Sequence, residues 1–331
     1  MPIELTPRLL RTWSMLGQRG TFGAVLTELA KDDPSLVALS ADLCNTSGLD
    51  RFQTAFPNRF FNTGIAEQGM VAAAAGLADG GYIPFATSFS NFLALRSNEF
   101  IRHFLGYMHC NVKLVGFCGG FSIELFGNTH YGMEDISAIR GISGLTILSP
   151  ADVYDVYHCV QYAASCKEPV YLRLTGKANQ PLLHKGDEPF SPLACEVLQE
   201  GSDVAILATG CVAYEAVKAA ALLEAEGISC TVANVHALKP FDADFVRRQA
   251  ENKKLIVTVE EHRTTGGLGS IVAELLSEAS GAPPLLRIGI PEGYPAPGEY
   301  SYLLEVAGLT SPQIYQAIKN KLDQQKGELS L

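Results

Sequence analysis

Short apolar runs alternate with helical segments along the first half of this chain, and the alternation constrains its fold more than any other feature. The expected strands are Leu36 to Ser40, Tyr82 to Thr87, Val112 to Phe117 and Val170 to Leu174, and the expected helices are Phe22 to Ala30, Asn91 to Tyr107 and Val153 to Ala164. Alternation of this kind predicts a parallel sheet covered on both faces. Sites in such sheets lie beyond the carboxyl ends of the strands, where Asp42, Gly64, Phe89 and Cys118 fall.

A second, smaller α/β unit is expected after a linker. Residues 176–193 lose periodicity and contain proline, glycine and charged residues. The strands expected beyond them are Asp203 to Ala208, Cys230 to Val235 and Leu255 to Glu260, and the helices are Ala213 to Glu226, Asp242 to Ala250, Gly269 to Ala279, Tyr302 to Val306 and Pro312 to Leu322. We therefore predict two domains, residues 1–185 and 186–331.

Composition excludes several classes of function. The chain has 331 residues, 47% of them hydrophobic and 18% charged, which fits a soluble α/β protein. A net charge of −10 without any basic block argues against a nucleic-acid partner. The eight cysteines form no C-x-x-C pair and lie mostly in apolar runs, so a reducing cytoplasm is expected. No apolar run approaches the ~18 residues of a membrane span, so no membrane partner is expected.

The segment Phe60 to Met70, FFNTGIAEQGM, contains the clearest candidate for a chemical role. A short apolar strand runs into Gly64, and a helix then opens with Glu67 in its first turn. This helix continues with small apolar residues nearly all round, so it is expected to be buried. A carboxylate placed at the start of a buried helix is suited to holding a proton against a ligand nitrogen. An ordinary acidic residue in a first helical turn is the alternative interpretation.

Six segments resemble the transketolase family of thiamine diphosphate enzymes in both order and spacing. They are FFNTGIAEQGMVAAAAGLA from Phe60, TSFSNF from Thr87, NTH from Asn128, LSPAD from Leu148, PVYLRL from Pro169 and EEHRTTGGLGS from Glu260. The resemblance covers about residues 10 to 320. It implies the C-terminal half of a transketolase, a parallel-sheet pyrimidine-binding domain followed by a smaller α/β C-terminal domain.

The resemblance also implies which residues meet the cofactor. Glu67 would hydrogen-bond N1′ of the aminopyrimidine ring of thiamine diphosphate, and Phe89 and Phe92 would form the slot for that ring. A third aromatic residue of the family falls near Leu95, which can pack but cannot stack. Asp42 would lie near the cofactor and the subunit contact. From the residues alone, core residues are the favoured interpretation of the two phenylalanines, and a helix or strand cap is the alternative for Asp42.

Substrate contacts follow from the same resemblance. His130 would assist proton transfer at a substrate hydroxyl, which suits an imidazole because its pKa lies near neutrality. Arg19 and Thr46 fall where transketolases bind the acceptor's sugar phosphate. A structural histidine and a solvated arginine are the alternative interpretations.

Three substrate positions depart from the family pattern. Phe126 replaces an aspartate that contacts the donor hydroxyl, Cys118 replaces a histidine, and Gly176 replaces an arginine. The loss of hydrogen-bonding groups relaxes a demand for the matching substrate hydroxyl. We therefore expect the cofactor chemistry of the family with a specialised or non-phosphorylated donor or acceptor.

Two further features are a glycine-rich loop in the second unit and the absence of one motif of the family. Thr265 to Ser270 opens a helix after a strand but matches no nucleotide-binding pattern, so the family's structural role and dimer contact are expected for it. The family's metal and diphosphate motif, Gly-Asp-Gly, does not occur in this chain. A separate subunit with that GDG…N motif would therefore hold Mg²⁺ and the diphosphate in an α2β2 heterotetramer.

Three functions remain open from the sequence. The first is a subunit of a split transketolase-like enzyme that transfers a two-carbon ketol unit from a ketose to an aldehyde. The second is a 2-oxoacid-decarboxylating relative, of the deoxyxylulose-phosphate synthase or 2-oxoacid dehydrogenase β-subunit type. The third is a catalytically silent scaffold homologue. Glu67, Phe89, Phe92 and His130 favour an enzyme, whereas Phe126 and Cys118 leave the scaffold open.

Overall fold

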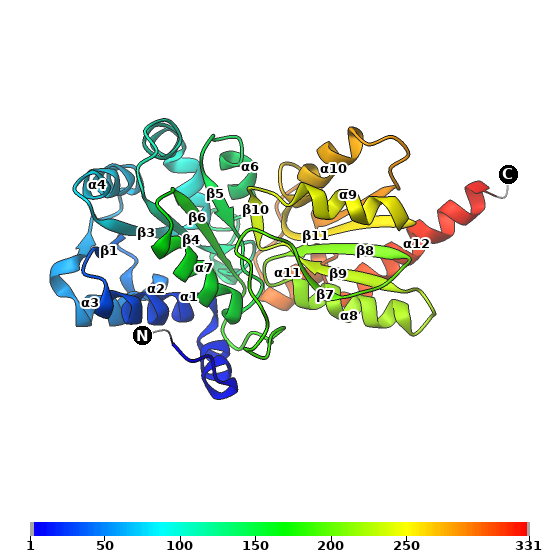
Figure 1. Cartoon of the computed structure of the whole chain (residues 1–331), viewed down its shortest axis with the longest axis horizontal. Helices are drawn as coiled ribbons and strands as arrows, with labels where there is room; N and C mark the ends of the chain where they lie inside the picture. The colour runs from blue at the N-terminus through cyan, green and yellow to red at the C-terminus, as the bar shows by residue number, and fades with distance from the viewer. Residues whose placement is uncertain (1–2, 330–331) are drawn as a thin grey trace.

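The computed structural model describes residues 3–329. Two α/β units lie side by side along the long axis of the molecule, the first coloured blue to green and the second lime-green to red (Figure 1). The expected α/β class, with a parallel first sheet, is confirmed. Among the described residues, no helix is long and apolar enough to cross a membrane.

Seven strands form the first sheet, in the order β10-β5-β6-β4-β3-β1-β2. They are β1 (Leu36–Ser40), β2 (Phe60–Asn62), β3 (Ile83–Phe89), β4 (Lys113–Gly119), β5 (Thr146–Leu148), β6 (Val170–Thr175) and β10 (Ala237–Lys239). All neighbours are parallel except β10 and β5. Ser40 of β1 pairs with Asn62 of β2 and Thr87 of β3, so β1 and β2 end level with one another and β3 continues to Phe89. The segments that follow them meet at one end of the sheet, where a site is expected.

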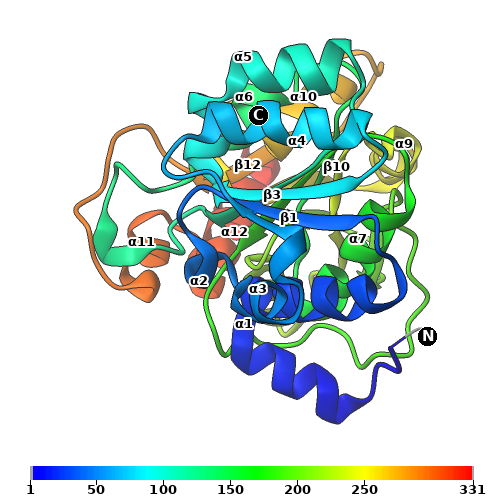
Figure 2. The same cartoon turned by 90° about the vertical axis from the view of Figure 1, so that its left-hand side faces the viewer.

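Helices cover both faces of this sheet. Helices α1, α3 and α7 lie on one face, and α4, α5 and α6 lie on the other (Figure 2). The helical segments are α1 (Pro7–Asp32), α2 (Cys44–Ser47), α3 (Asp50–Ala55), η1 (Pro57–Arg59), α4 (Glu67–Asp79), η2 (Phe92–Arg96), α5 (Asn98–Phe100), η3 (Ile101–Tyr107), η4 (Glu124–Phe126), α6 (Asp135–Ile139) and α7 (Val153–Ser165). Segments η2 and η3 are π-helical, a geometry that is frequent at functional sites.

Helix α1 is interrupted at Gly17, whose φ of 71° and ψ of −178° lie outside the helical region. A β-carbon at this position would lie 2.6 Å from the carbonyl oxygen of Lys177. Glycine is therefore required for the helix and the segment after β6 to approach so closely. Arg19, one of the predicted site residues, follows directly after this break.

Helix α4 buries only one face within this chain. Its buried residues are Glu67, Met70, Val71, Ala74 and Ala75, and its exposed residues include Gln68, Gly69, Ala73 and Gly76. The spacing of three and four places the buried set on one stripe. The expectation of a helix buried all round is therefore wrong for the single chain, because nothing in the described residues covers the opposite stripe.

Five strands form the second sheet, in the order β12-β11-β8-β9-β7. They are β7 (Glu196–Gln199), β8 (Val204–Thr209), β9 (Cys230–Asn234), β11 (Leu255–Arg263) and β12 (Leu285–Ile290). Edge strand β7 is antiparallel to β9, and the other pairs are parallel. The helices of this unit are α8 (Ala213–Glu224), α9 (Ala243–Asn252), α10 (Leu268–Ser277), α11 (Tyr300–Val306) and α12 (Ser311–Leu329).

Strand β10 joins the two units. It follows β9 of the second sheet along the chain but pairs antiparallel with β5 of the first, Ala237 with Leu148 and Lys239 with Ile147. The ammonium group of Lys239 also donates to the carbonyl oxygen of Arg140, at 2.8 Å. Residues expected in the second domain thus complete the first sheet. The boundary between residues 185 and 186 stays a prediction.

Candidate active site

Glu67 is the first residue of α4, and it is 1% exposed. Its Oε1 accepts a hydrogen bond from the hydroxyl of Ser88 on β3, at 3.0 Å. Its Oε2 accepts from Nη1 of Arg96 at 2.5 Å. The side chain is therefore an acceptor at both oxygens. The predicted burial of this carboxylate at a helix start is confirmed.

Four rings gather next to this carboxylate. Phe89 ends β3 and Phe92 begins η2, and their ring centroids lie 5.5 Å apart at an interplanar angle of 82°. The imidazole of His130 lies 5.4 Å from Phe89 and 5.1 Å from Phe92. Phe126 lies 5.3 Å from His130 on its other side and is 62% exposed. These rings come from two segments that are distant in the sequence, residues 89–92 and 126–130, so the fold brings the predicted set together.

The environment of His130 favours its neutral form. Burial is the main cause that lowers the pKa of His130, and the positive charge of Arg96 lowers it further. Nδ1 of His130 lies 2.9 Å from the hydroxyl of Thr129. The side-chain amide of Asn91, two residues after the end of β3, donates to the carbonyl oxygen of Thr129 at 2.9 Å and holds this loop in place. A neutral imidazole can accept a proton from a ligand hydroxyl.

Asp42 shapes the loop that leads into α4. The side chain of Asn62 donates to Oδ1 of Asp42 at 3.0 Å, and Oδ1 of Asn62 accepts from the backbone amides of Asp42 and Gly64. Gly64 has a φ of 70°, which a residue with a side chain rarely adopts. Asp42 therefore lies exposed beyond β1 and ties the ends of two neighbouring strands together.

Arg19 and Thr46 meet in a separate cleft of about 260 Å³, which Asn45 and Arg51 also line. Nη1 of Arg19 donates to the carbonyl oxygen of Thr46 at 2.8 Å. Cys118 is 1% exposed, and burial raises the pKa of its thiol to about 11, although the charge of Arg19 opposes this shift. Cys118 is therefore a buried, neutral thiol.

Two family models match the chain one after the other. The transketolase pyrimidine-binding domain matches residues 15–180, and the transketolase C-terminal domain matches residues 194–314. The chain belongs to the transketolase family. The predicted identity, the C-terminal half of a transketolase, is thereby confirmed.

Relatives of this transketolase-family chain include separate subunits and a longer single chain. The 6-deoxy-6-sulfo-D-fructose transketolase subunit SqwH of Clostridium sp. (strain MSTE9) is 39% identical over 299 residues, which are 90% of this chain and 92% of the relative. One similar solved structure is that of a split gene transketolase, described as an inactive beta4 tetramer. It matches with a TM-score of 0.82 and is 38% identical in sequence. The match covers 92% of this chain and 97% of the chain in that structure. The 1-deoxy-D-xylulose-5-phosphate synthase of Symbiobacterium thermophilum is 36% identical over 314 residues, which are 93% of this chain and 47% of the synthase.

The three departures from the transketolase pattern differ in their surroundings. Phe126 is exposed at the mouth of the ring cluster, whereas Cys118 is buried. Gly176 has a φ of 70°, and a β-carbon there would lie 1.8 Å from the amide nitrogen of Gln180. An arginine cannot occupy this position without displacing that amide. The neighbouring Lys177 forms an ion pair with Glu124 at 2.5 Å.

The glycine-rich loop of this transketolase-family chain binds one of its own carboxylates. The backbone amides of Leu268 and Gly269 donate to the two carboxylate oxygens of Glu260, each at 2.7 Å. Burial raises the pKa of Glu260 to about 7, although these two hydrogen bonds oppose the shift. The start of α10 is thus filled from within, which supports the structural interpretation of this loop.

Arg96 and Ser88 are the site residues that the sequence analysis missed. Both contact Glu67, and the guanidinium of Arg96 also covers the ring of Phe92, 4.3 Å from its centroid. Arg96 follows Phe92 by four positions in a helical segment, and side chains at this spacing are neighbours. That spacing was the signal that could have revealed the arginine.

Proposed function

We propose that this chain is the pyrimidine-binding subunit of a split, thiamine diphosphate-dependent transketolase-like enzyme. It would transfer a two-carbon ketol unit from a ketose to an aldehyde, and it would act together with a separate diphosphate-binding subunit. The observation that carries this proposal is the buried carboxylate of Glu67 beside the rings of Phe89, Phe92 and His130.

The chemistry of this group fits an aminopyrimidine. Glu67 offers carboxylate oxygens for a ring nitrogen, and Phe89 and Phe92 offer apolar surface for a flat ring. When bound, thiamine diphosphate supplies the nucleophilic carbon that cleaves a bond next to a carbonyl group. Glu67 would orient the ring and hold a proton at its nitrogen, and burial would keep water from competing for that proton. His130 would hold the proton of a substrate hydroxyl.

A partner subunit would bring the remaining half of the cofactor site, with Mg²⁺ and the diphosphate. Four large apolar side chains lie exposed on segments next to Glu67: Phe61 at 40%, Ile65 at 78%, Leu95 at 50% and Phe126 at 62%. Together with the exposed alanine and glycine stripe of α4, they form the kind of surface that a partner covers. The relatives that are themselves subunits support a separate partner, with which this chain would form an α2β2 assembly.

The substrate would be a sugar or keto compound that differs from the pentose phosphates. Phe126 offers no acceptor for a donor hydroxyl, and Gly176 offers no cation for a phosphate. The SqwH relative is named for a sulfonated sugar, which supports a specialised substrate here. Eight free thiols favour a reducing compartment, and we place the protein in the cytoplasm.

A second candidate is a 2-oxoacid-decarboxylating enzyme, because the chain also resembles part of a 1-deoxy-D-xylulose-5-phosphate synthase. Release of carbon dioxide from pyruvate by the reconstituted complex would identify this activity. Ketol transfer from a ketose without gas release would identify the first.

The decisive experiment is cofactor binding with and without the partner. The chain is co-purified with its partner from the native cell, and thiamine diphosphate with Mg²⁺ is titrated into the complex and into the chain alone. Tight binding by the complex only, weakened by Glu67→Gln, is the expected result. Absence of binding in both samples would overturn the catalytic proposal and leave a scaffold homologue.

A further inference from the structure

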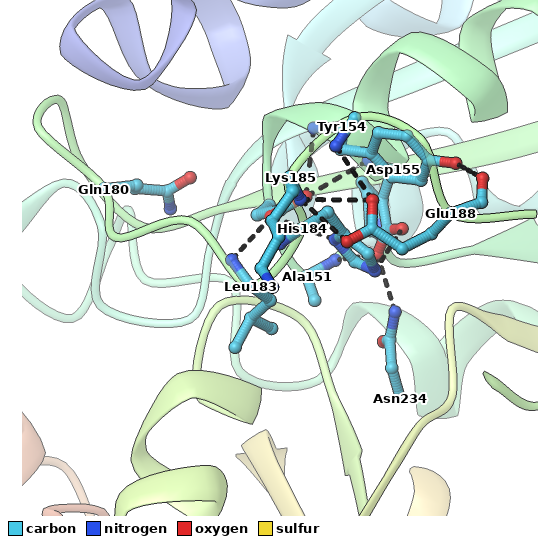
Figure 3. A network of polar contacts seen from close by, with 12 residues as sticks. Ala151, Tyr154, Asp155, Gln180, Leu183, His184, Lys185, Glu188 and Asn234 are labelled. Carbon is cyan, nitrogen blue, oxygen red and sulfur yellow. Dashed lines mark hydrogen bonds and ion pairs between the residues drawn. The ribbon is translucent and has the colours of Figure 1, made fainter. Parts of the chain in front are cut away.

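A second cluster of ionisable side chains lies at the junction of the two units, outside the candidate active site (Figure 3). Asp152 caps the start of α7 and Asp155 lies in its first turn. His184 comes from the predicted linker, Glu196 from β7, and His236 from the segment between β9 and β10. Four of the five residues are at least 97% buried, and the side chain of Glu196 is 19% exposed.

His184 is the positive charge of this cluster. Its Nδ1 lies 3.0 Å from Oδ2 of Asp152, and its Nε2 lies 2.9 Å from both carboxylate oxygens of Glu196. Burial opposes the charged ring, but these hydrogen bonds raise the pKa of His184 to about 11. Asp155 is a third carboxylate in this cluster, and burial raises its pKa.

One carboxylate oxygen of Asp155 accepts hydrogen bonds, and the other has no hydrogen-bond partner. Its Oδ2 accepts from the backbone amide of Ala151 and from the side chain of Asn234, both at 2.8 Å. Its Oδ1 has no hydrogen-bond partner and lies 4.0 Å from Nε2 of His184, so it points into the cluster. Asn234 also donates to Oε2 of Glu196 at 3.2 Å, and it therefore holds two carboxylates side by side.

His236 resembles Asp155 in this respect, because one ring nitrogen is hydrogen-bonded and the other has no partner. Its Nε2 lies 2.8 Å from the carbonyl oxygen of Ser191, which can only accept, so Nε2 carries the hydrogen. Nδ1 is then the unprotonated nitrogen, and it is buried without a partner. Phe190 stacks on the ring at 4.7 Å and fixes its orientation, and His158 stacks on the other face of Phe190 at 4.6 Å.

We propose that Asp155, Glu196 and His236 bind a divalent transition-metal ion of the zinc type. One ligand atom from each residue lies within 4.8 Å of the others. Zinc bonds of about 2.0–2.2 Å require ligand atoms roughly 3–4 Å apart, so a small contraction closes the site. A donor set of one imidazole and two carboxylates suits zinc.

The atoms that do not bind the metal are held as in known metal sites. An imidazole that ligates a metal ordinarily donates its other N–H to a carbonyl or carboxylate oxygen, and ligating carboxylates are hydrogen-bonded in turn. The contact of His236 with Ser191 and the contacts of Asn234 with both carboxylates follow this pattern. Because the ligands come from α7 on one side and from β7 and the β9–β10 segment on the other, the ion ties the two units together.

The test is metal binding by the full chain. The purified chain is stripped with a chelator, dialysed against Zn²⁺ or Mg²⁺, and its metal content is measured, with Co²⁺ absorption as a report of ligand geometry. We expect one equivalent of zinc per chain, little magnesium, and a higher melting temperature with zinc.

His236→Gln should weaken zinc binding by more than about 100-fold, since the loss of a residue that only hydrogen-bonds to a ligand already costs about 10–100-fold in metal affinity. His158→Gln, one ring further away, is the matched control and should bind zinc normally.

Three results would overturn the proposal. They are no zinc uptake by the wild-type chain, equal uptake by His236→Gln, and a zinc position elsewhere in anomalous diffraction from wild-type crystals. The diffraction experiment decides the question even if His236→Gln does not fold. A chain that takes up no zinc, but melts at a lower temperature when His236 is replaced, would indicate a proton shared between Asp155 and His236 in place of the metal.

Discussion

Arg96 places Nη1 2.5 Å from Oε2 of Glu67 while its guanidinium lies over the ring of Phe92. One side chain thus contacts both the carboxylate and one of the aromatic rings that the proposed function assigns to the cofactor. The arginine is 42% exposed, so it can move without disturbing the core. It compensates the charge of Glu67 in the chain alone.

Replacement of Arg96 should change how the activity of the complex depends on pH. Burial is the main cause that lowers the pKa of His130, and the positive charge of Arg96 lowers it further. Without the guanidinium, His130 should stay protonated to higher pH, so the acid limb of the kcat/KM profile should move up. Arg96→Leu should show this shift and Arg96→Lys much less of it, because lysine keeps the charge but not the stacking. An unchanged profile in Arg96→Leu would contradict this effect of Arg96 on His130.

Glu67→Gln should lower kcat/KM of the complex by about 10²–10⁴-fold, the usual contribution of a positioned acid or base. The amide keeps the size of the side chain but cannot exchange the proton. Steady-state kinetics and cofactor titration check this, with Glu99→Gln as the control because Glu99 is 72% exposed on α5. Equal activity of the two variants would argue for the scaffold function.

Phe126→Asp should shift substrate preference toward donors with a free hydroxyl. The new carboxylate can accept a hydrogen bond worth about 1.5–3 kcal/mol, or roughly tenfold or more in kcat/KM. The fold should tolerate the change because Phe126 is 62% exposed. The ratio of kcat/KM for a hydroxylated donor and its deoxy analogue is the measurement. A parallel loss for both donors would indicate that Phe126 only packs.

Arg173→Leu should destabilise the chain by about 3–5 kcal/mol, because it leaves the buried carboxylate of Asp135 without its cationic partner. Nε of Arg173 lies 2.8 Å from Oδ2 of Asp135, and both side chains are 0% exposed. Urea unfolding measures the change. The control is Arg102→Ala, whose exposed ion pair with Glu99 should contribute about 0–1 kcal/mol. Similar losses in both variants would contradict this assignment.

His262 should make stability fall in mild acid. Burial lowers the pKa of His262 to about 4 from 6.5, and the neutral ring donates through Nδ1 to the carbonyl oxygen of Arg263 at 2.8 Å. Between pH 6.5 and 4 the unfolded chain therefore binds more protons than the folded chain. The stabilisation that the neutral ring provides is complete above pH 6.5 and is lost as pH falls through 4. His262→Gln should flatten the slope of the unfolding free energy by up to about 1.4 kcal/mol per pH unit. An unaltered slope between these pH values would show that another group titrates.

Long apolar strands were predictable from the sequence, and short strands were not. β1, β4 and β6 lie within two residues of their expected bounds because continuous apolar runs identify fully buried parallel strands. β5 and β10 have three residues each, too few for any periodic pattern. The burial of α4 was overestimated because alanine is compatible with either face of a helix.

Residue type and the order of the segments were sufficient to predict part of the candidate site. Glu67, Phe89, Phe92 and His130 meet as expected, since they follow neighbouring strands or the loop beside them. The pairing of Arg96 with Glu67 depends on a π-helical turn, and the cluster around Asp155 depends on how two sheets meet. The spacing of Phe92 and Arg96 indicates that these two side chains are neighbours, but the contact of Arg96 with Glu67 and the cluster around Asp155 cannot be read from the linear sequence.

Strand β10 follows β9 of the second unit but forms the edge of the first sheet. This arrangement affects any attempt to produce the first unit by itself. A fragment that stops before Ala237 would leave the backbone amides and carbonyls of β5 without their antiparallel neighbour. An uncovered edge of this kind recruits strands from other molecules, and the fragment would tend to self-associate. A useful truncation therefore has to keep residues 237–239 or block the free edge with a proline or a lysine.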